Sequence, residues 1–109
     1  MDYETLLEMC GGDHEMIRNA AEYYPESSRE AFVTMQAGVE SKDHKKVQMA
    51  AHRLKSIASQ LCCYELSGLC ASLEKMTYQD PPFVCEDLIE RIRETSERTW
   101  LEIQERVLG

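Results

Sequence analysis

The sequence predicts an all-α fold, an antiparallel four-helix bundle with a short additional helix at the N-terminus. The chain of 109 residues has only five glycines and three prolines, and its commonest side chains lose little rotamer freedom in a helix. Apolar residues recur at steps of three and four along several segments, which is the spacing of an amphipathic helix. Short turns separate these segments, so consecutive helices should pack antiparallel within one domain, residues 1–109.

The part of the chain before Ser41 predicts two helices. A short one begins near Asp2 and ends at Gly11-Gly12, and Asp13 is placed to cap the next helix. The apolar stripe of that second helix consists of Ile17, Ala20, Tyr24, Ser28, Ala31, Met35 and Val39. Pro25 interrupts the stripe, and because proline costs about 3 kcal/mol in a helix interior we expect a kink or a break there.

The turn Ser41-Lys42-Asp43 ends in the expected N-cap of the next helix. From there an apolar stripe runs from Val47 to Met76. A single helix of about 35 residues would be long for a domain of this size. We therefore expect a hidden break near Cys62, which divides the stripe into two helices.

The run Tyr78-Gln79-Asp80-Pro81-Pro82 predicts a turn before the last helix, which spans about residues 83–107. The residues expected to face the core are Leu88, Ile92, Thr99, Ile103 and Val107. Acid precedes base at i,i+4 in Asp87/Arg91, Glu94/Arg98 and Glu102/Arg106. We expect these to be ion pairs on the solvent face without a functional role.

Charge and cysteine usage restrict the function classes. The formal net charge of −8 disfavours nucleic-acid binding, because nucleic-acid-binding proteins present basic surfaces to the phosphates. The N-terminus lacks the features of a secretory signal, and no segment approaches the roughly 20 apolar residues of a membrane span. Five cysteines are an odd number, which favours reduced thiols over a disulfide framework. We expect a cytoplasmic monomer.

Residues 50–61 contain the most informative pattern. At about 100° per residue, Ala50, Leu54, Ile57 and Leu61 gather on one side of a helix and His52 points away from them. The side of His52 also carries Lys45, Gln48, Lys55, Ser56 and Ser59. A neutral imidazole nitrogen can attack a phosphoryl group, and an ammonium group one turn on can hold the transferred phosphate. Geometry alone leaves this open, since an exposed histidine near a lysine is common on helices.

The residue string around His52 is more specific than its geometry. Ala51-His52-Arg53-Leu54-Lys55-Ser56 is followed by Leu61-Cys62-Cys63, Leu66, Leu69-Cys70 and Leu73-Glu74. Together with the turns at Gly12-Asp13 and Asp43, this combination resembles the pattern of histidine-containing phosphotransfer (HPt) domains, A-H-x-L-K-G, then G-A, then L-x-x-L/C-C-x-x-L-E. The resemblance covers roughly residues 12–76, and the last helix matches only in general character.

The resemblance implies a phosphorelay module of two-component signal transduction. His52 would accept a phosphoryl group on Nε2 from a receiver-domain aspartate and pass it to another receiver, and Lys55 would neutralise the phosphoryl charge. Glu74 stands where some members of the family hydrogen-bond Nδ1 and so fix the tautomer of the ring. Its alternative role is that of a solvated glutamate near a helix end.

The resemblance also implies the partners. These would be receiver domains of response regulators or of hybrid histidine kinases. Mg²⁺ is expected in the receiver, with no metal or cofactor bound by this chain. No Gly-rich phosphate loop occurs in the sequence. We therefore expect a phosphoryl carrier without autokinase activity rather than an enzyme.

Two positions depart from the pattern of the family. Ser56 replaces the glycine after the lysine, on the face that a partner approaches, so docking should be weakened or altered rather than lost. The serine hydroxyl could donate to phosphoryl oxygens. Cys62 replaces a glycine at the bend between two helices. Because a left-handed conformation strains a non-glycine residue by roughly 1–2 kcal/mol, we expect the bend to use ordinary backbone angles.

Other readings of the sequence remain. The alternative function is a non-phosphorylated adaptor or inhibitor that binds a receiver or kinase domain, and a carboxylate-metal hydrolase has no E-x-x-H pair to support it. The cysteines lack metal-site spacing and are expected to be packing residues. His14 and His44 are expected on the surface. Most of the methionines Met9, Met16, Met35, Met49 and Met76 are expected in the core.

Overall fold

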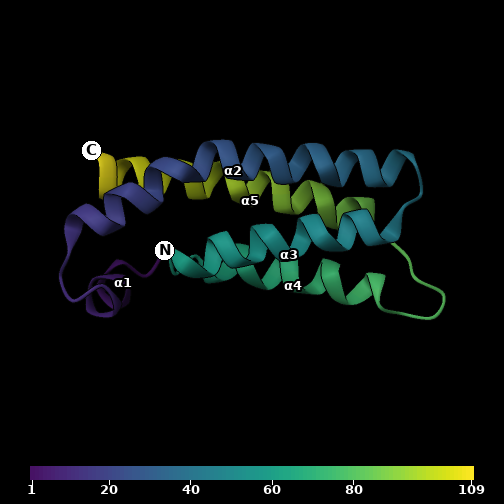
Figure 1. Ribbon diagram of the computed structural model, residues 1–109, viewed down its shortest axis with the longest axis horizontal. Helices are drawn as coiled ribbons and strands as arrows, with labels where there is room; N and C mark the ends of the chain where they lie inside the picture. Colours follow the sequence, from purple (N-terminus) through teal and green to yellow (C-terminus); the bar gives the residue numbers. More distant parts are fainter.

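The computed structural model describes residues 1–109 and is all-helical, as Figure 1 shows. Its five α-helices are α1 (Tyr3–Met9), α2 (His14–Glu40), α3 (His44–Gln60), α4 (Tyr64–Thr77) and α5 (Glu86–Ile103). A π-helical turn, η1 (Gln104–Leu108), continues α5. The predicted all-α class is confirmed, and so is the short leading helix. None of the helices combines the length and the apolar composition that a membrane span needs.

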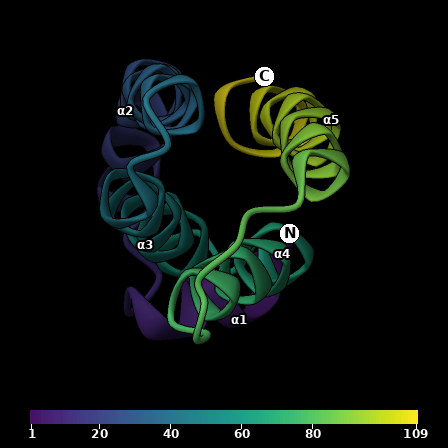
Figure 2. The same ribbon diagram turned by 90° about the vertical axis from the view of Figure 1, so that its right-hand side faces the viewer.

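The four long helices lie side by side along the longest axis of a molecule that measures 45 × 20 × 18 Å. Helix α3 packs against α2 and α4, and α5 packs against α4 and α2. Each of these helices runs opposite to the one before it (Figure 1). The end-on view of Figure 2 shows them around a common interior, with α1 at the edge of the group.

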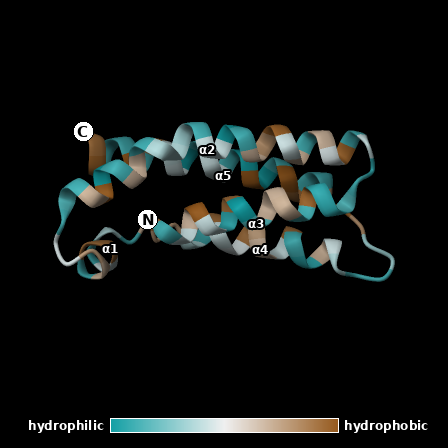
Figure 3. Cartoon of the chain, in the orientation of Figure 1, coloured by the Kyte–Doolittle hydropathy of each residue, from teal (hydrophilic) through white to brown (hydrophobic).

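The core is built from one face of each long helix. Residues with almost no exposed surface include Met35 on α2, Leu54 on α3, Leu66 on α4 and Ile92 on α5. Figure 3 shows hydrophilic residues alternating with apolar ones along these helices, so each helix keeps a polar side for solvent. The buried face of α3 consists of Val47, Ala50, Ala51, Leu54 and Ala58. Burial of this face directs the opposite one, which carries His52, into water.

Aspartate caps begin three of the helices, and the two predicted caps, Asp13 and Asp43, are confirmed. Asp13 accepts a hydrogen bond from the backbone N–H of Met16, and Asp43 accepts one from that of Lys46, each at 3.1 Å. Asp2 caps α1 in the same way. Each cap satisfies an N–H group that the helix itself leaves unpaired, and so fixes where the helix starts.

The turn between α2 and α3 brings two backbones close together. A Cβ atom added to Gly38 would lie 2.8 Å from Cγ2 of Val47 and 3.0 Å from its backbone nitrogen. The Asp43 N–H donates to the Gly38 carbonyl oxygen at 2.8 Å. Glycine at position 38 therefore permits the close approach of α2 to the first turn of α3.

Helix α2 continues through Pro25, so the break allowed for by the sequence does not occur. Figure 1 instead shows its first part inclined to the rest. The neighbouring Tyr24 is buried, stacks on Trp100 with ring centroids 6.0 Å apart, and shares a hydrogen bond of 2.7 Å with the hydroxyl of Ser96. These contacts offset the cost of a proline inside the helix, which is about 3 kcal/mol.

The hidden break near Cys62 is confirmed, but its backbone differs from the expectation. Cys62 has a φ of 54°, in the left-handed region, so ordinary backbone angles are the wrong prediction. This conformation lets the Cys63 N–H donate to the Ala58 carbonyl oxygen at 2.8 Å and close the end of α3. The Cys62 side chain is almost fully buried, with Sγ 3.7 Å from Sδ of Met9. Packing therefore offsets a strain of roughly 1–2 kcal/mol.

Three details of the last helix and of the stripes differ from the predictions. Helix α5 begins at Glu86, whereas the sequence predicted a start at about residue 83. Of the three expected ion pairs only Glu102–Arg106 forms, at 4.0 Å, while Arg98 reaches Glu65 on α4 instead. The residues predicted inward that are only partly buried are Ala20, Val39, Ile57, Leu69, Met76 and Thr99. Helix packing buries neighbouring positions more completely, because the actual crossing of helices sets the centre of each stripe.

The methionines also correct the prediction. Met35 is buried, but Met9, Met16 and Met49 are more than half exposed. Met49 lies outside the buried face of α3, so its place in the helical period indicates exposure, and apolar character alone was a misleading guide.

Candidate functional site

His52 lies on the solvent face of α3, and its side chain is 64% exposed. The cap at Asp43 and the buried face of α3 together determine this direction. The prediction that His52 is not a core histidine is confirmed. A ring with this exposure can be reached by another macromolecule.

Glu74 connects the ring to the neighbouring helix. Its Oε2 atom lies 2.8 Å from Nδ1 of His52, and its Oε1 atom lies 2.8 Å from Nζ of Lys55. Because α4 packs along α3, this side chain is brought beside the histidine and only 12% of it is exposed. The structure therefore excludes the alternative of a solvated glutamate.

The ionisation of the Glu74 carboxyl group determines which nitrogen of the His52 ring carries the proton. Burial on its own would raise the pKa of Glu74, but the hydrogen bonds and charges of Lys55 and His52 outweigh it and hold the pKa below its ordinary value. An ionised carboxylate only accepts hydrogen bonds, so Nδ1 must carry the proton that it donates. In the neutral ring Nε2 is then unprotonated, and its lone pair faces solvent.

Lys55 and Ser56 flank the ring within the next turn of α3. The Lys55 side chain is 29% exposed, and its ammonium group has three N–H donors, of which Glu74 occupies one. The Ser56 hydroxyl donates to the backbone carbonyl oxygen of His52 at 3.1 Å. The serine proton is thus directed to the helix backbone rather than to the space above the ring.

Comparison with known proteins assigns the family. The family model described as the Hpt domain matches residues 4–100. The chain belongs to the Hpt domain family. Hpt domains are phosphotransfer modules of two-component signalling and carry phosphoryl groups rather than act as ATP-dependent kinases. No match is found among curated proteins or among solved structures.

The surroundings of His52 in this Hpt domain include groups that the sequence did not single out. Arg53 pairs with Glu30 of α2 at 2.7 Å and ties α3 to α2 beside the histidine. Met49, one turn before His52, has 62% of its surface exposed. A helical wheel places Met49 within 60° of His52, so the periodicity that identified the face contained this signal.

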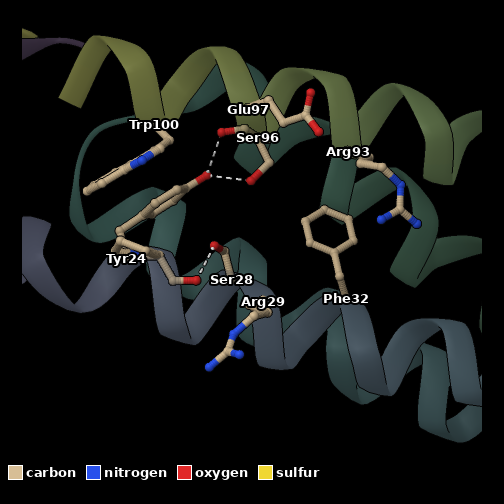
Figure 4. A pocket seen from close by; sticks show the side chains of 9 residues that line it. Tyr24, Ser28, Arg29, Phe32, Arg93, Ser96, Glu97 and Trp100 are labelled. Carbon is tan, nitrogen blue, oxygen red and sulfur yellow. Dashed lines mark hydrogen bonds between the residues drawn. The ribbon is translucent and has the colours of Figure 1, made fainter. Parts of the chain in front are cut away.

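A separate cavity of about 280 Å³ lies between α2 and α5 of the Hpt domain (Figure 4). Tyr24, Phe32 and Trp100 form its apolar walls, and Arg93 lies over the Phe32 ring at 5.1 Å from the centroid. The Tyr24 and Ser96 hydroxyls bond each other at the base. No residue of α3 or α4 lines this cavity, so it plays no part in the chemistry at His52. No cluster of three or more potential metal ligands is present in the chain.

Proposed function

We propose that this domain carries a phosphoryl group on Nε2 of His52, taken from the aspartate of one receiver domain and passed to the aspartate of another. One observation carries the proposal: an exposed imidazole whose Nδ1 is bound to Glu74 at 2.8 Å, which leaves Nε2 as the nucleophile. The same carboxylate accepts a hydrogen bond from Lys55 and so keeps the ammonium group beside the nucleophile.

The proposed transfer exchanges one bond to phosphorus for another. The Nε2 lone pair forms the N–P bond while the bond between phosphorus and the aspartyl oxygen breaks and leaves the receiver carboxylate. The ring becomes a phosphoimidazolium ion, since Nδ1 keeps its proton. Glu74 stabilises that positive charge through the Nδ1–H hydrogen bond. The reverse sequence of bonds delivers the group to the second receiver.

Lys55 supplies positive charge for the transferred group. Its ammonium group can keep the bond to Glu74 and still donate to a phosphoryl oxygen, because two of its three donors are free of Glu74. In the proposal Mg²⁺ belongs to the receiver, and this chain supplies the nucleophile and the cation. Ser56 contributes a short side chain to the docking face, with its proton held by the helix.

The remaining parts of the proposal concern arrangement and setting. The four long helices act as an antiparallel four-helix bundle that presents His52 from a rigid pair, α3 and α4. The domain works as a monomer in the cytoplasm, where its five thiols stay reduced. Receiver domains of response regulators or hybrid kinases are its partners.

Phosphotransfer from a panel of receiver domains tests this function. Receivers charged with a small-molecule phosphodonor should transfer label to the chain as an acid-labile, base-stable adduct. His52→Gln should abolish labelling. His14→Gln and His44→Gln serve as matched controls and should leave it unchanged, since no carboxylate is bonded to either of these rings.

The outcomes separate the proposal from the adaptor alternative. Label that persists in His52→Gln contradicts the assignment of the phosphoacceptor. A chain that binds a receiver equally well with His52→Ala but never acquires label from any receiver is an adaptor.

A further inference from the structure

The charge of the chain is distributed unevenly over the fold. The segment from Ser41 to Cys63, which contains all of α3, carries one acidic residue, Asp43, and a net charge of +4 in a chain of net charge −8. Its five basic residues are Lys42, Lys45, Lys46, Arg53 and Lys55. The helix that carries His52 is thus the positively charged part of an otherwise acidic molecule.

Three of these cations are free to meet a partner. Arg53 and Lys55 are paired with Glu30 and Glu74. Lys42, Lys45 and Lys46 are exposed and form no ion pair within the chain. The one carboxylate of this segment, Asp43, caps α3 through the backbone of Lys46.

Lys45 shares the face of His52. Lys45 lies seven positions before His52, so a helix of 100° per residue places them within about 20° of each other and about 10 Å apart along the axis. Met49 lies between them and is exposed. Lys45, Met49 and His52 therefore form a continuous strip, which we call the α3 strip.

We propose that the α3 strip binds an acidic surface of the receiver domain, and that Lys45 determines which receivers transfer efficiently. This rests on the proposed function, because a receiver that delivers its aspartyl phosphate to His52 must cover the adjoining turns of α3. An acidic receiver is repelled by most of this chain and attracted only by α3. That asymmetry orients the encounter and raises the association rate for receivers with a matching acidic patch.

The test compares two charge reversals that change the net charge equally. Lys45→Glu alters the α3 strip. Arg18→Glu alters the exposed first turns of α2, about 18 Å along that helix from Glu30, which pairs with Arg53. Transfer from a panel of phosphorylated receivers is measured against receiver concentration at low and high salt, and thermal unfolding checks that both variants are folded.

Lys45→Glu should lower kcat/KM about five- to tenfold for the receivers that wild type prefers, mainly through KM, and should weaken the salt dependence. Arg18→Glu should stay within about twofold of wild type. A receiver variant in which an acidic surface residue is changed to lysine should recover transfer with Lys45→Glu.

The remaining outcomes contradict the inference, and they show whether the proposed function fails with it. If Lys45→Glu and Arg18→Glu have equal kcat/KM values and wild type is labelled on His52, Lys45 does not determine receiver choice, but the proposed function is unaffected. Absence of label in wild type with every receiver removes both. Wild-type binding to anionic lipid vesicles that is lost in Lys45→Glu, with unchanged transfer, assigns the strip to a membrane surface instead.

Discussion

Replacing Glu74 by glutamine tests whether one carboxylate organises the site. Glutamine keeps the size of the side chain but has one carbonyl oxygen and one NH₂ group, which can only donate. The carboxylate accepts from both Nδ1 of His52 and Nζ of Lys55, each at 2.8 Å. In Glu74→Gln one of these two donors must lose its acceptor.

The size of the effect follows from the geometry. A hydrogen bond to a charged group contributes about 1.5–3 kcal/mol. Because 64% of the His52 side chain is exposed, water replaces part of a lost bond, and we expect about 1–1.5 kcal/mol, close to a tenfold decrease in the transfer rate. The same loss should allow the tautomer with the proton on Nε2, which cannot attack phosphorus.

Two measurements read this out. Long-range ¹H–¹⁵N NMR of the His52 ring reports which nitrogen carries the proton, and quenched-flow phosphotransfer at saturating receiver gives the rate. Glu65→Gln on the same helix is the matched control, since Glu65 is exposed and its only side-chain ion pair is with Arg98, at 3.5 Å. A Glu74→Gln domain with the tautomer and rate of wild type refutes the reasoning.

Three further predictions concern charge and packing. Lys55→Ala should slow transfer more than it weakens receiver binding, because the ammonium group acts on the transferred phosphate; an unchanged rate at saturating receiver assigns it to surface charge only. Because the folded pKa of Glu74 lies below its ordinary value of 4.5, its contribution to stability is present above that pH and is lost as the pH falls through the folded pKa. The difference in unfolding free energy between wild type and Glu74→Gln, from urea titrations, should therefore shrink from pH 6 toward about pH 3; a difference that stays constant contradicts the shift. Gly38→Ala should destabilise the domain by about 1–3 kcal/mol because its Cβ meets the backbone of the next helix, whereas Gly68→Ala, with open space at its Cβ, should stabilise it by about 0.5–1 kcal/mol. Equal midpoints for the two glycine variants in thermal unfolding would count against the packing argument.

Part of the candidate site could be predicted from the sequence alone. Periodicity alone placed His52 on the polar side of its helix and Lys55 one turn on, because both residues share a helix whose apolar positions are unambiguous. The role of Glu74 stayed open at that stage, since it lies on another helix and no pattern within one helix reports the packing of two. The structure shows the contacts themselves: the Glu74 carboxylate lies 2.8 Å from Nδ1 of His52 and 2.8 Å from Nζ of Lys55.

At Pro25 and Cys62, local rules about backbone conformation did not decide the structure. A rule about proline allowed for a break at Pro25, and a rule about left-handed residues argued against a positive φ at Cys62. Both local costs are overridden, by the burial of Tyr24 in one case and of the Cys62 side chain in the other.

By itself the sequence determined the all-α class, the starts of the capped helices and the outward direction of His52, because each depends on residues within a few turns of one another. Only the tertiary structure decided that Glu74 joins His52 to Lys55, and that Arg98 pairs with Glu65 on α4 rather than with Glu94 on its own helix. These facts depend on the rotation and spacing of neighbouring helices, which the packing of the whole core sets.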